Sequence, residues 1–250
     1  MKKLFLNTKA RQSGNPYIIR PHSWAFGDYL ISATFCKILN DNGIKSSLYD
    51  NYKDLVECPS FNPQNDNSGP VFVTKLPFRQ LAESFNEQFN VSVNIPDKYP
   101  VPTKFVSMDI DSVDVAVTTR TGTFTKCKQW PYFNELFFLF DKYNISYIDL
   151  DKNNIRDYEF LNHIRKCKVY LGLDTGPAHY ASKEGAGKTL IIQSGYCHFE
   201  FWAAMYDFEA IQIPVDCCPC IPAQYCENNY KCMRDISPEM VLESVIKKLD

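Results

Sequence analysis

The sequence predicts an α/β protein made of two Rossmann-like domains. Short apolar runs alternate with segments of helical period along most of the chain, which is typical of parallel sheets covered by helices. Three prolines within residues 96–102 interrupt this alternation and are typical of a linker. With 250 residues, of which 45% are hydrophobic, the chain can build two small cores. We therefore expect a small N-terminal domain over residues 1–103 and a C-terminal domain over residues 104–250.

The N-terminal domain is expected to contain three strands and one helix. Apolar runs predict strands at 16–22, 46–51 and 69–77. Between the first two strands, residues 27–43 have the spacing of an amphipathic helix that ends at Gly43.

The C-terminal domain is expected to alternate strands with helices. The predicted strands cover 114–120, 145–151, 168–174, 189–195 and 209–214, and the predicted helices cover 130–144, 157–167, 176–184 and 237–249. Pro131 suits the first turn of its helix, and Ser237 is expected to cap the last one.

Charge and hydropathy exclude several classes of protein. Lys and Arg number 27 and Asp and Glu number 29, so the net charge of -2 gives no basic footprint for nucleic acid. No run approaches the ~18 apolar residues that a membrane-spanning helix needs. The first residues, MKKLFLNTKARQ, are not typical of a secretion signal. We therefore expect a cytoplasmic protein without a transmembrane segment.

The stretch KEGAGKTLII, residues 183–192, contains GKT ahead of an apolar run, as a phosphate-binding P-loop does. However, the P-loop pattern needs a glycine where this chain has Ser182. The order of elements is also reversed, because a predicted helix precedes the glycines and a predicted strand follows them. We therefore interpret Gly185 and Gly187 as a helix end and a turn.

Polar residues follow the predicted strand at 168–174, in the place where ligands bind in such folds. Asp174 ends this strand, and Thr175 and Gly176 open the next helix, whose free N–H groups favour a phosphate. His179 lies within the first turn and can donate to a phosphate oxygen. The alternative is an ordinary capped helix with a structural histidine.

A second polar group follows the predicted strand at 114–120. Thr118 and Thr119 offer hydroxyls, and Arg120 and Lys128 offer positive charge, which together suit an anionic ligand. The alternative is a solvated basic loop. Because Lys128 lies in a loop, we expect the fold to tolerate its removal.

Gly27 and Asp28 open the first predicted helix, directly after the first strand and its loop. An acidic residue at such a place most often caps the helix. Asp28 can instead act as a general base that faces a ligand across a cleft.

Ten cysteines, in the reducing compartment that we expect, favour metal binding over disulfides. Cys217, Cys220, Cys226 and Cys232 have the spacing C-x2-C-x5-C-x5-C, with Cys218 left over, and four thiolates fit tetrahedral zinc or iron. Because the cluster precedes the last helix, we expect a structural metal knuckle. The alternatives are thiols without a metal and a redox pair.

Taken in order, these motifs resemble those of the heptosyltransferase-like family, glycosyltransferase family 9. VTTRTGTFTKCKQWP is similar to the family's T-T-R…K-x-W-P segment, and DTGPAH is similar to its D-[ST]-G-x-x-H block. CCPC…C…CMRDISPEMV resembles the C-x-P-C…CM…I-x-P-E-x-V tail, and FGDYLISATFCKIL resembles the G-D helix start of the N-terminal domain. The resemblance is strongest over residues 113–246, and the N-terminal domain is shorter than in the family.

The resemblance implies the GT-B fold, in which two Rossmann-like domains face each other across a cleft. It also implies an inverting transfer of a heptose or another hexose-like sugar from a nucleotide-diphosphate sugar to an acceptor hydroxyl, with no cofactor for the chemistry. The implied donor contacts are Thr118, Thr119, Arg120, Lys128, Asp174, Thr175, Gly176 and His179, with Asp149 or Asp151 at the ribose. Asp28 would then deprotonate the acceptor.

Two other interpretations stay open at this point. The chain can be a non-catalytic relative of the family that binds a nucleotide or a nucleotide sugar, or an interaction module built around the metal knuckle. The base and the sugar of the donor are not named by the sequence. The acceptor can be a lipopolysaccharide core, a protein side chain or another hydroxyl.

Overall fold

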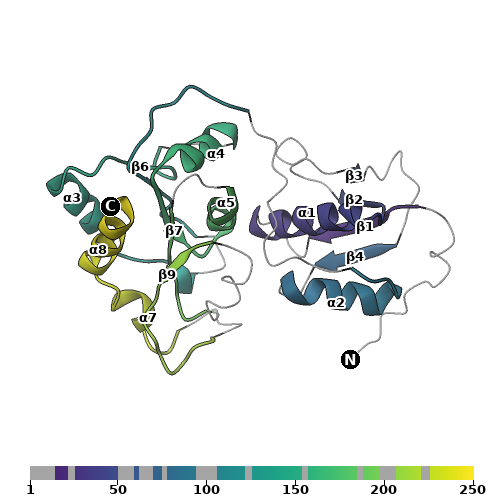
Figure 1. The fold of residues 1–250 in the computed structure, drawn as a ribbon. Coiled ribbons are helices and arrows are strands. Elements are labelled where there is room, and N and C mark those ends of the chain that lie inside the picture. The colour runs from purple at the N-terminus through teal and green to yellow at the C-terminus, as the bar shows by residue number, and fades with distance from the viewer. Residues whose placement is uncertain are drawn as a thin grey trace. The chain divides into compact units, whose positions relative to one another are not determined.

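Strands and helices alternate along the chain in the computed structural model, as the sequence predicts (Figure 1). The structure describes residues 15–21, 26–49, 59–61, 70–74, 78–93, 106–121, 126–153, 157–184, 188–196, 207–220 and 226–250. The chain divides into two units, Met1–Lys104 and Phe105–Asp250, and each unit contains one parallel sheet. None of the helices in the described part of the chain combines the length and the apolar character that crossing a membrane requires.

The sheet of the N-terminal unit has the order β3-β2-β1-β4. The elements of this unit are β1 (Tyr17–Pro21), α1 (Phe26–Asp41), β2 (Ser46–Tyr49), β3 (Ser60–Phe61), β4 (Val71–Thr74) and α2 (Phe78–Phe89). The three predicted strands and the predicted helix are present, and α1 is followed by Gly43 at a φ of 76°, a conformation that favours glycine. The short strand β3 and the helix α2 were not predicted.

Aromatic rings form much of the core of the N-terminal unit. Phe85 of α2 contacts Phe72 of β4 and Phe35 of α1, with ring centroids 5.1 Å and 5.5 Å away. Tyr17 of β1 meets the same ring at 5.1 Å. All three contacts are edge-to-face, a geometry that stabilises a core beyond the burial of apolar area alone.

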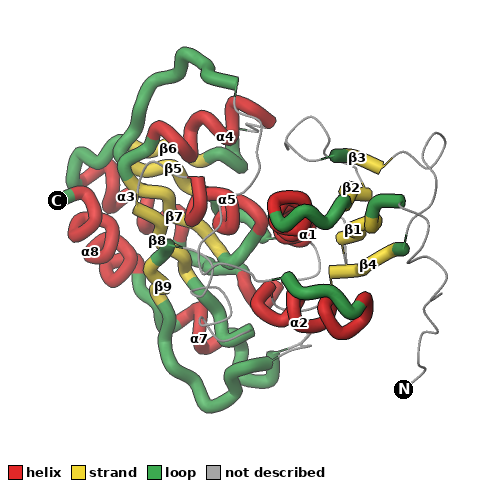
Figure 2. Tube along the Cα trace, turned by 45° about the vertical axis from the view of Figure 1, so that its right-hand side comes forward, coloured by secondary structure: helices red, strands yellow, loops and turns green. Residues whose placement is uncertain are grey.

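The sheet of the C-terminal unit has the order β6-β5-β7-β8-β9, and all its strand pairs are parallel. Its elements are β5 (Val115–Val117), η2 (Lys126–Lys128), α3 (Phe133–Lys142), β6 (Tyr147–Asp149), α4 (Asp157–Lys166), β7 (Val169–Leu173), α5 (Gly176–Glu184), β8 (Lys188–Ile192), β9 (Glu209–Ile211), α7 (Lys231–Arg234) and α8 (Pro238–Leu249). Helices α3 and α8 cover one face of this sheet, and α4 and α5 cover the other (Figure 2).

The last helix begins as predicted. The backbone N–H of Met240 donates to Ser237 Oγ at 3.3 Å, so Ser237 caps α8, and Pro238 occupies its first turn. This cap fixes the start of α8 against the core of the C-terminal unit, where Val241 and Val245 are fully buried.

Trp130 joins the loop after β5 to the C-terminal tail. Its side chain is 1% exposed, and its Nε1–H donates to the carbonyl oxygen of Ile236 at 2.9 Å. The helix predicted from residue 130 therefore begins only at Phe133, because Trp130 is held in the core outside the helical ladder. Pro131 precedes α3 and does not lie in its first turn, which corrects the sequence-based expectation.

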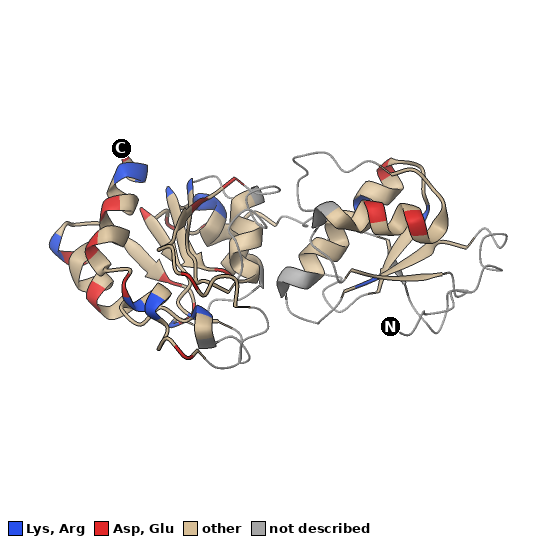
Figure 3. Ribbon diagram, turned by 90° about the horizontal axis from the view of Figure 1, so that it is seen from below, with Lys and Arg blue, Asp and Glu red and all other residues tan. Residues whose placement is uncertain are grey.

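Among the described residues of the C-terminal unit, Lys and Arg are interspersed with Asp and Glu along the ribbon (Figure 3). This mixture agrees with the net charge of -2. It is typical of solvated surfaces and differs from the one-sided basic stripe that a nucleic-acid-binding domain presents.

Candidate active site

The order of the strands places one switch point in the C-terminal sheet. β5 pairs with β6 on one side and with β7 on the other, so the chain winds in opposite directions from β5. In open parallel sheets, ligands bind outside the carboxyl ends of the strands at such a point. The two polar groups that the sequence analysis selected follow β5 and β7, and the fold therefore brings them together.

An ion pair connects these two groups. Lys128 Nζ lies 2.8 Å from Asp174 Oδ2 and donates to the Asp174 carbonyl oxygen at 3.3 Å. The exposed fractions of the two side chains are 12% and 1%, so the pair is largely shielded from water. The ring of Tyr196, which follows β8, lies 4.4 Å from the same ammonium group. Lys128 therefore connects the two polar groups across the switch point, and its shielded pair is the reason to expect that its removal weakens the fold.

Thr118 is placed differently from the prediction. It is 1% exposed, and its Oγ1 lies 2.6 Å from the hydroxyl oxygen of Tyr170 on β7. Successive residues of an extended chain point to opposite faces, so Thr118 and Thr119 do not face the same way. In this structure the hydroxyl of Thr118 packs inside the unit. Thr119 is half-buried, and a ligand contact by this residue stays a prediction.

Gly172 lies beside the pair formed by Thr118 and Tyr170. A Cβ at Gly172 would lie 2.5 Å from Thr118 Oγ1 and 2.8 Å from Tyr170 Cζ. Because both neighbours are buried, we expect Gly172→Ala to lower the free energy of unfolding by about 1–3 kcal/mol. Urea denaturation measures this loss. In a Tyr170→Phe background the same substitution should cost less, and an equal cost would contradict the packing described here.

The carboxylates of Asp149 and Asp151, at the end of β6 and just after it, accept hydrogen bonds from backbone N–H groups of nearby loops, including the loop after β5. Asp151 Oδ2 accepts hydrogen bonds from the N–H groups of Thr119 and Arg120, at 2.8 Å and 3.1 Å. Asp149 Oδ1 accepts from the N–H groups of Asp151 and Lys152, each at 3.0 Å. Both aspartates thus organise the loops at the carboxyl ends of β5 and β6. A ribose contact by Asp151 stays a prediction.

Helix α5 begins at Gly176, where the sequence places its start. Thr175 opens the turn, and its hydroxyl donates to the carbonyl oxygen of Leu173 at 3.3 Å. His179 follows in the first turn and is 8% exposed. Burial lowers the pKa of His179 well below 6.5, and the nearby charge of Lys128 lowers it further. The imidazole is therefore neutral at pH 7, and a neutral ring can still donate one N–H to a phosphate.

The lowered pKa of His179 predicts a loss of stability in mild acid. Below about pH 6.5 the unfolded chain takes up a proton that the folded state resists. The free energy of unfolding should therefore fall as the pH falls from 6.5, by at most about 1.4 kcal/mol per pH unit for this group. Urea denaturation between pH 7.5 and 5.5 measures the slope. His179→Gln should show a shallower slope, and equal slopes in both proteins would contradict the assignment.

The N-terminal sheet has its own switch point, between β1 and β4, which pair directly. Helix α1 follows β1 and begins at Phe26, so Asp28 is its third residue and lies at that edge of the sheet. This differs from the expected cap position. Inside the first turn a carboxylate still favours the helix, through the positive end of the helix dipole. The side chain of Asp28 lies outside the described residues.

The P-loop is excluded by the order of elements. Helix α5 ends at Glu184, and β8 begins at Lys188, so the helix precedes the GKT stretch and the strand begins within it. A P-loop needs the strand first and the helix after the glycines. The amino group of Lys188 donates to the carbonyl oxygen of Lys248 in the last helix. Lys188 therefore belongs to the packing between β8 and α8.

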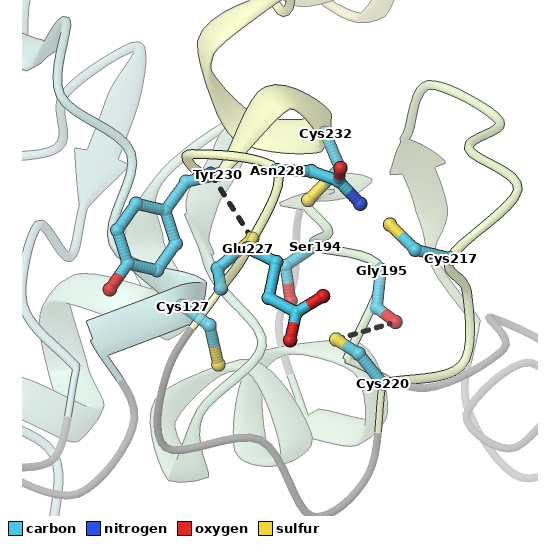
Figure 4. Close-up of a pocket in the computed structure, with 10 residues that line it drawn as sticks. Cys127, Ser194, Gly195, Cys217, Cys220, Glu227, Asn228, Tyr230 and Cys232 are labelled. Atoms are coloured by element: carbon cyan, nitrogen blue, oxygen red, sulfur yellow. Dashed lines mark hydrogen bonds between the residues drawn. The ribbon is translucent and has the colours of Figure 1, made fainter.

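The predicted cysteine cluster lines one pocket of about 190 Å³ (Figure 4). Cys217, Cys220, Cys226 and Cys232 all contribute, together with Cys127 of η2, which the sequence analysis did not include. Among the described residues, no three His, Cys, Asp or Glu side chains are arranged so that they could hold a metal ion. The closed four-cysteine knuckle that the spacing predicts is therefore not formed in this conformation, although its members share a pocket.

Sequence reasoning missed three contributors to this region. Tyr196 lies at the carboxyl end of β8, the strand beside β7, and this position could have identified it from the sequence. Trp130 was identified only as part of a motif, and the sequence gives no sign of its hydrogen bond to the carbonyl oxygen of Ile236. Cys127 was missed because it lies 90 residues before Cys217, and only the fold brings the two into one pocket.

Comparison with known proteins defines the class of fold. No protein-family model and no curated protein matches the sequence. Solved structures do match, and glycosyltransferases are among them. At 12–13% sequence identity the likeness establishes the fold alone, so the chain has a mixed α/β fold with parallel sheets that matches a glycosyltransferase fold.

The matching structures include the dodecameric iron-containing heptosyltransferase TibC in complex with ADP-D-beta-D-heptose. The TM-score is 0.68 at 13% identity, over 94% of this chain and 76% of that chain. TibC from enterotoxigenic E. coli H10407 gives the same values. A glycosyltransferase family 9 protein from Veillonella parvula DSM 2008 has a TM-score of 0.56 at 12% identity, over 94% of this chain and 97% of that chain.

Proposed function

We propose that this chain is an inverting glycosyltransferase that moves a heptose or another hexose-like sugar from a nucleotide-diphosphate sugar to an acceptor hydroxyl. The observation that carries the proposal is the shielded pair of Lys128 and Asp174, located at the switch point of a sheet with a glycosyltransferase fold. A lysine beside the N–H groups of a helix start is a typical phosphate site. The TibC structure with ADP-D-beta-D-heptose supports a donor of this kind.

The donor site stabilises the charge of the leaving nucleoside diphosphate. As the bond between the sugar and the phosphate breaks, negative charge grows on the phosphate oxygens, and preorganised donors lower the barrier. Lys128 and the N–H groups at the start of α5 supply these donors. The proposed donor contacts are Thr119, Arg120, Lys128, Asp151, Asp174, Thr175, Gly176 and His179. Because Lys128 is already paired with Asp174, it is held in place before the donor arrives.

Asp28 is the proposed general base for the acceptor hydroxyl. A sugar hydroxyl is a poor nucleophile near neutral pH, so inversion at the sugar carbon needs a group that removes the proton. Asp28 is an acidic residue at the switch point of the N-terminal sheet, where a ligand is expected to bind. The GT-B arrangement of the two units is part of the same proposal.

The pocket cysteines are proposed to hold a structural zinc or iron. Thiol donors fit either metal, and both TibC structures matched here are called iron-containing. The spacing of the sequence predicts Cys217, Cys220, Cys226 and Cys232 as ligands. When bound, the metal would crosslink the segments of the tail between β9 and α8 to one another. The transfer reaction itself does not need it.

Incubation with a panel of nucleotide-diphosphate sugars tests the transfer. Released nucleoside diphosphate is measured in the presence of candidate hydroxyl acceptors or water, and NMR of the product gives the anomeric configuration. We expect release with inversion for at least one donor. Donor binding without any release would identify a non-catalytic binding protein, and neither binding nor release would overturn the proposal.

A further inference from the structure

Tyr196 lies just after β8, at the same edge of the C-terminal sheet as the candidate donor site. β8 pairs in parallel with β7, and Ile192 is the register partner of Leu173, so the two strands end side by side. Asp174 follows β7 directly, and Tyr196 comes shortly after β8. The ring of Tyr196 is therefore carried by the strand next to the one that holds the carboxylate partner of Lys128.

The ammonium group of Lys128 is contacted by both a carboxylate and an aromatic ring. Its Nζ lies 2.8 Å from Asp174 Oδ2 and 4.4 Å from the centroid of the Tyr196 ring. The face of an aromatic ring is partially negative, so it attracts the ammonium group. Because the side chain of Lys128 is only 12% exposed, this attraction is stronger than it would be at an open surface.

A lysine needs such contacts if it is to keep one position. Its four-carbon stem is flexible, and its ammonium group lacks the fixed fork of a guanidinium group. Ordering the stem when a ligand binds would reduce the affinity, so a lysine that is already ordered binds better. The carboxylate of Asp174 orders Lys128 but also offsets its charge. The ring of Tyr196 has no net charge, so it holds the ammonium group and leaves its positive charge for a ligand.

The backbone that carries Tyr196 is itself fixed to the segment after β9. Gln212 Nε2 donates to the carbonyl oxygen of Ser194 at 3.0 Å, and the N–H of Cys220 donates to the carbonyl oxygen of Gly195 at 3.1 Å. The N–H of Tyr196 donates to Ser194 Oγ at 3.2 Å. These bonds order the backbone from which the ring projects toward Lys128.

We propose that Tyr196 is a positioning residue of the donor site, whose ring holds the ammonium group of Lys128 in place for the diphosphate. The inference rests on the proposed function, because it takes Lys128 as a diphosphate contact. Tyr196 acts through Lys128 and needs no contact with the donor. The part of the side chain that matters is the ring and not the hydroxyl.

Calorimetric titration with ADP, GDP and UDP tests this role, and the nucleotide that binds most tightly is then used for every variant. Tyr196→Leu should weaken binding by about threefold to tenfold, as expected for the loss of a cation–π contact. Tyr196→Phe keeps the ring and should stay within about twofold of the wild type. If Tyr196→Phe binds as weakly as Tyr196→Leu, the hydroxyl is responsible and the proposal is wrong.

Tyr143→Leu is the matched control for loss of an aromatic ring. Tyr143 also contacts an ammonium group, that of Lys142, with 5.7 Å between Nζ and the ring centroid, but it is 52% exposed at the end of α3. This variant should bind the nucleotide as the wild type does. A loss equal to that of Tyr196→Leu would contradict a specific role for Tyr196.

Fluorination of the ring separates electrostatic attraction from packing. Tyr196→Phe variants whose ring carries one, two or three fluorine atoms nearly keep the shape of the ring, while each fluorine withdraws negative charge from its face. The affinity should fall with each added fluorine. Equal affinity along the series would show that the ring only fills space, which would overturn the proposal. The series decides the question even if Tyr196→Leu does not fold.

A double-mutant cycle shows whether Tyr196 acts through Lys128. In a Lys128→Ala background, Tyr196→Leu should cause no further loss of affinity. A further loss of the same size would mean that Tyr196 contacts the nucleotide directly, and the positioning role would be wrong. Wild-type protein that binds none of the three nucleotides overturns the diphosphate site and this role together. Equal binding by wild type and Tyr196→Leu overturns the role of Tyr196 alone.

Discussion

Asp28→Asn is expected to fold and to bind the donor normally, while its turnover falls by about 10²-fold or more. The amide keeps the shape of the carboxylate, but it cannot accept the proton of the acceptor hydroxyl. Positioned proton transfer typically contributes 10²–10⁴-fold to a rate, which sets the size of the loss. Single-turnover transfer and the melting temperature, measured side by side, give both quantities.

If Asp28 has only a structural role, the transfer rate and the melting temperature are expected to change differently. A first-turn carboxylate favours a helix by about 0.3–1 kcal/mol, so its loss would lower the melting temperature slightly and leave the rate unchanged. Asp41→Asn is the matched control, because Asp41 lies at the other end of α1 in an exposed pair with Lys37. A full-rate Asp28→Asn enzyme would rule out the base assignment.

Lys128→Ala is expected to weaken both donor binding and the fold. Loss of a charge-assisted bond to the diphosphate should reduce nucleotide affinity by about 1.5–3 kcal/mol. Removal of the ammonium group also breaks its ion pair with the shielded carboxylate of Asp174. The free energy of unfolding should therefore fall on the order of 3 kcal/mol, as it does when one partner of a buried pair is removed. Calorimetry and urea denaturation measure the two effects.

A second substitution separates these two effects. In the double variant with Asp174→Asn, the buried charge is gone, so much of the stability should return while nucleotide affinity stays weak. Lys168→Ala is the matched control, because Lys168 pairs with Asp114 at 2.7 Å but is 68% exposed. This control should lose less than about 1 kcal/mol and bind nucleotide normally. If Lys128→Ala behaves like the control in both assays, Lys128 has no role at the site.

Apart from the short helices η2 and α7, the regular elements of the C-terminal unit follow from the sequence because their patterns are local. The bounds of α5 were predicted as 176–184, and all five residues of β7 are buried, as its apolar run indicates. The elements of the N-terminal unit were predicted less completely. Helix α2 was missed although Leu81, Phe85 and Phe89 have helical spacing, and β3 is too short to show a period.

The location of the candidate site could be predicted from the sequence, but the contacts within it could not. Polar residues at strand ends identified both edges of the switch point. The pairing of Lys128 with Asp174 joins residues far apart in the chain, and only the order β5-β7 brings them together. The burial of Thr118 against Tyr170 also depends on that neighbouring strand. Contacts between segments that are distant in the chain leave no local pattern in the sequence, so they could not be predicted from it.

The central claim is that the switch point between β5 and β7 binds the diphosphate of a nucleotide sugar. Its most direct test is the melting temperature of the wild-type chain across a panel of nucleoside diphosphates and nucleotide-diphosphate sugars. A ligand at one hundred times its dissociation constant stabilises the folded state by about 2.7 kcal/mol. We predict a clear rise for at least one member of the panel, with a much smaller rise in Lys128→Ala. An unchanged melting temperature across the whole panel would contradict the claim.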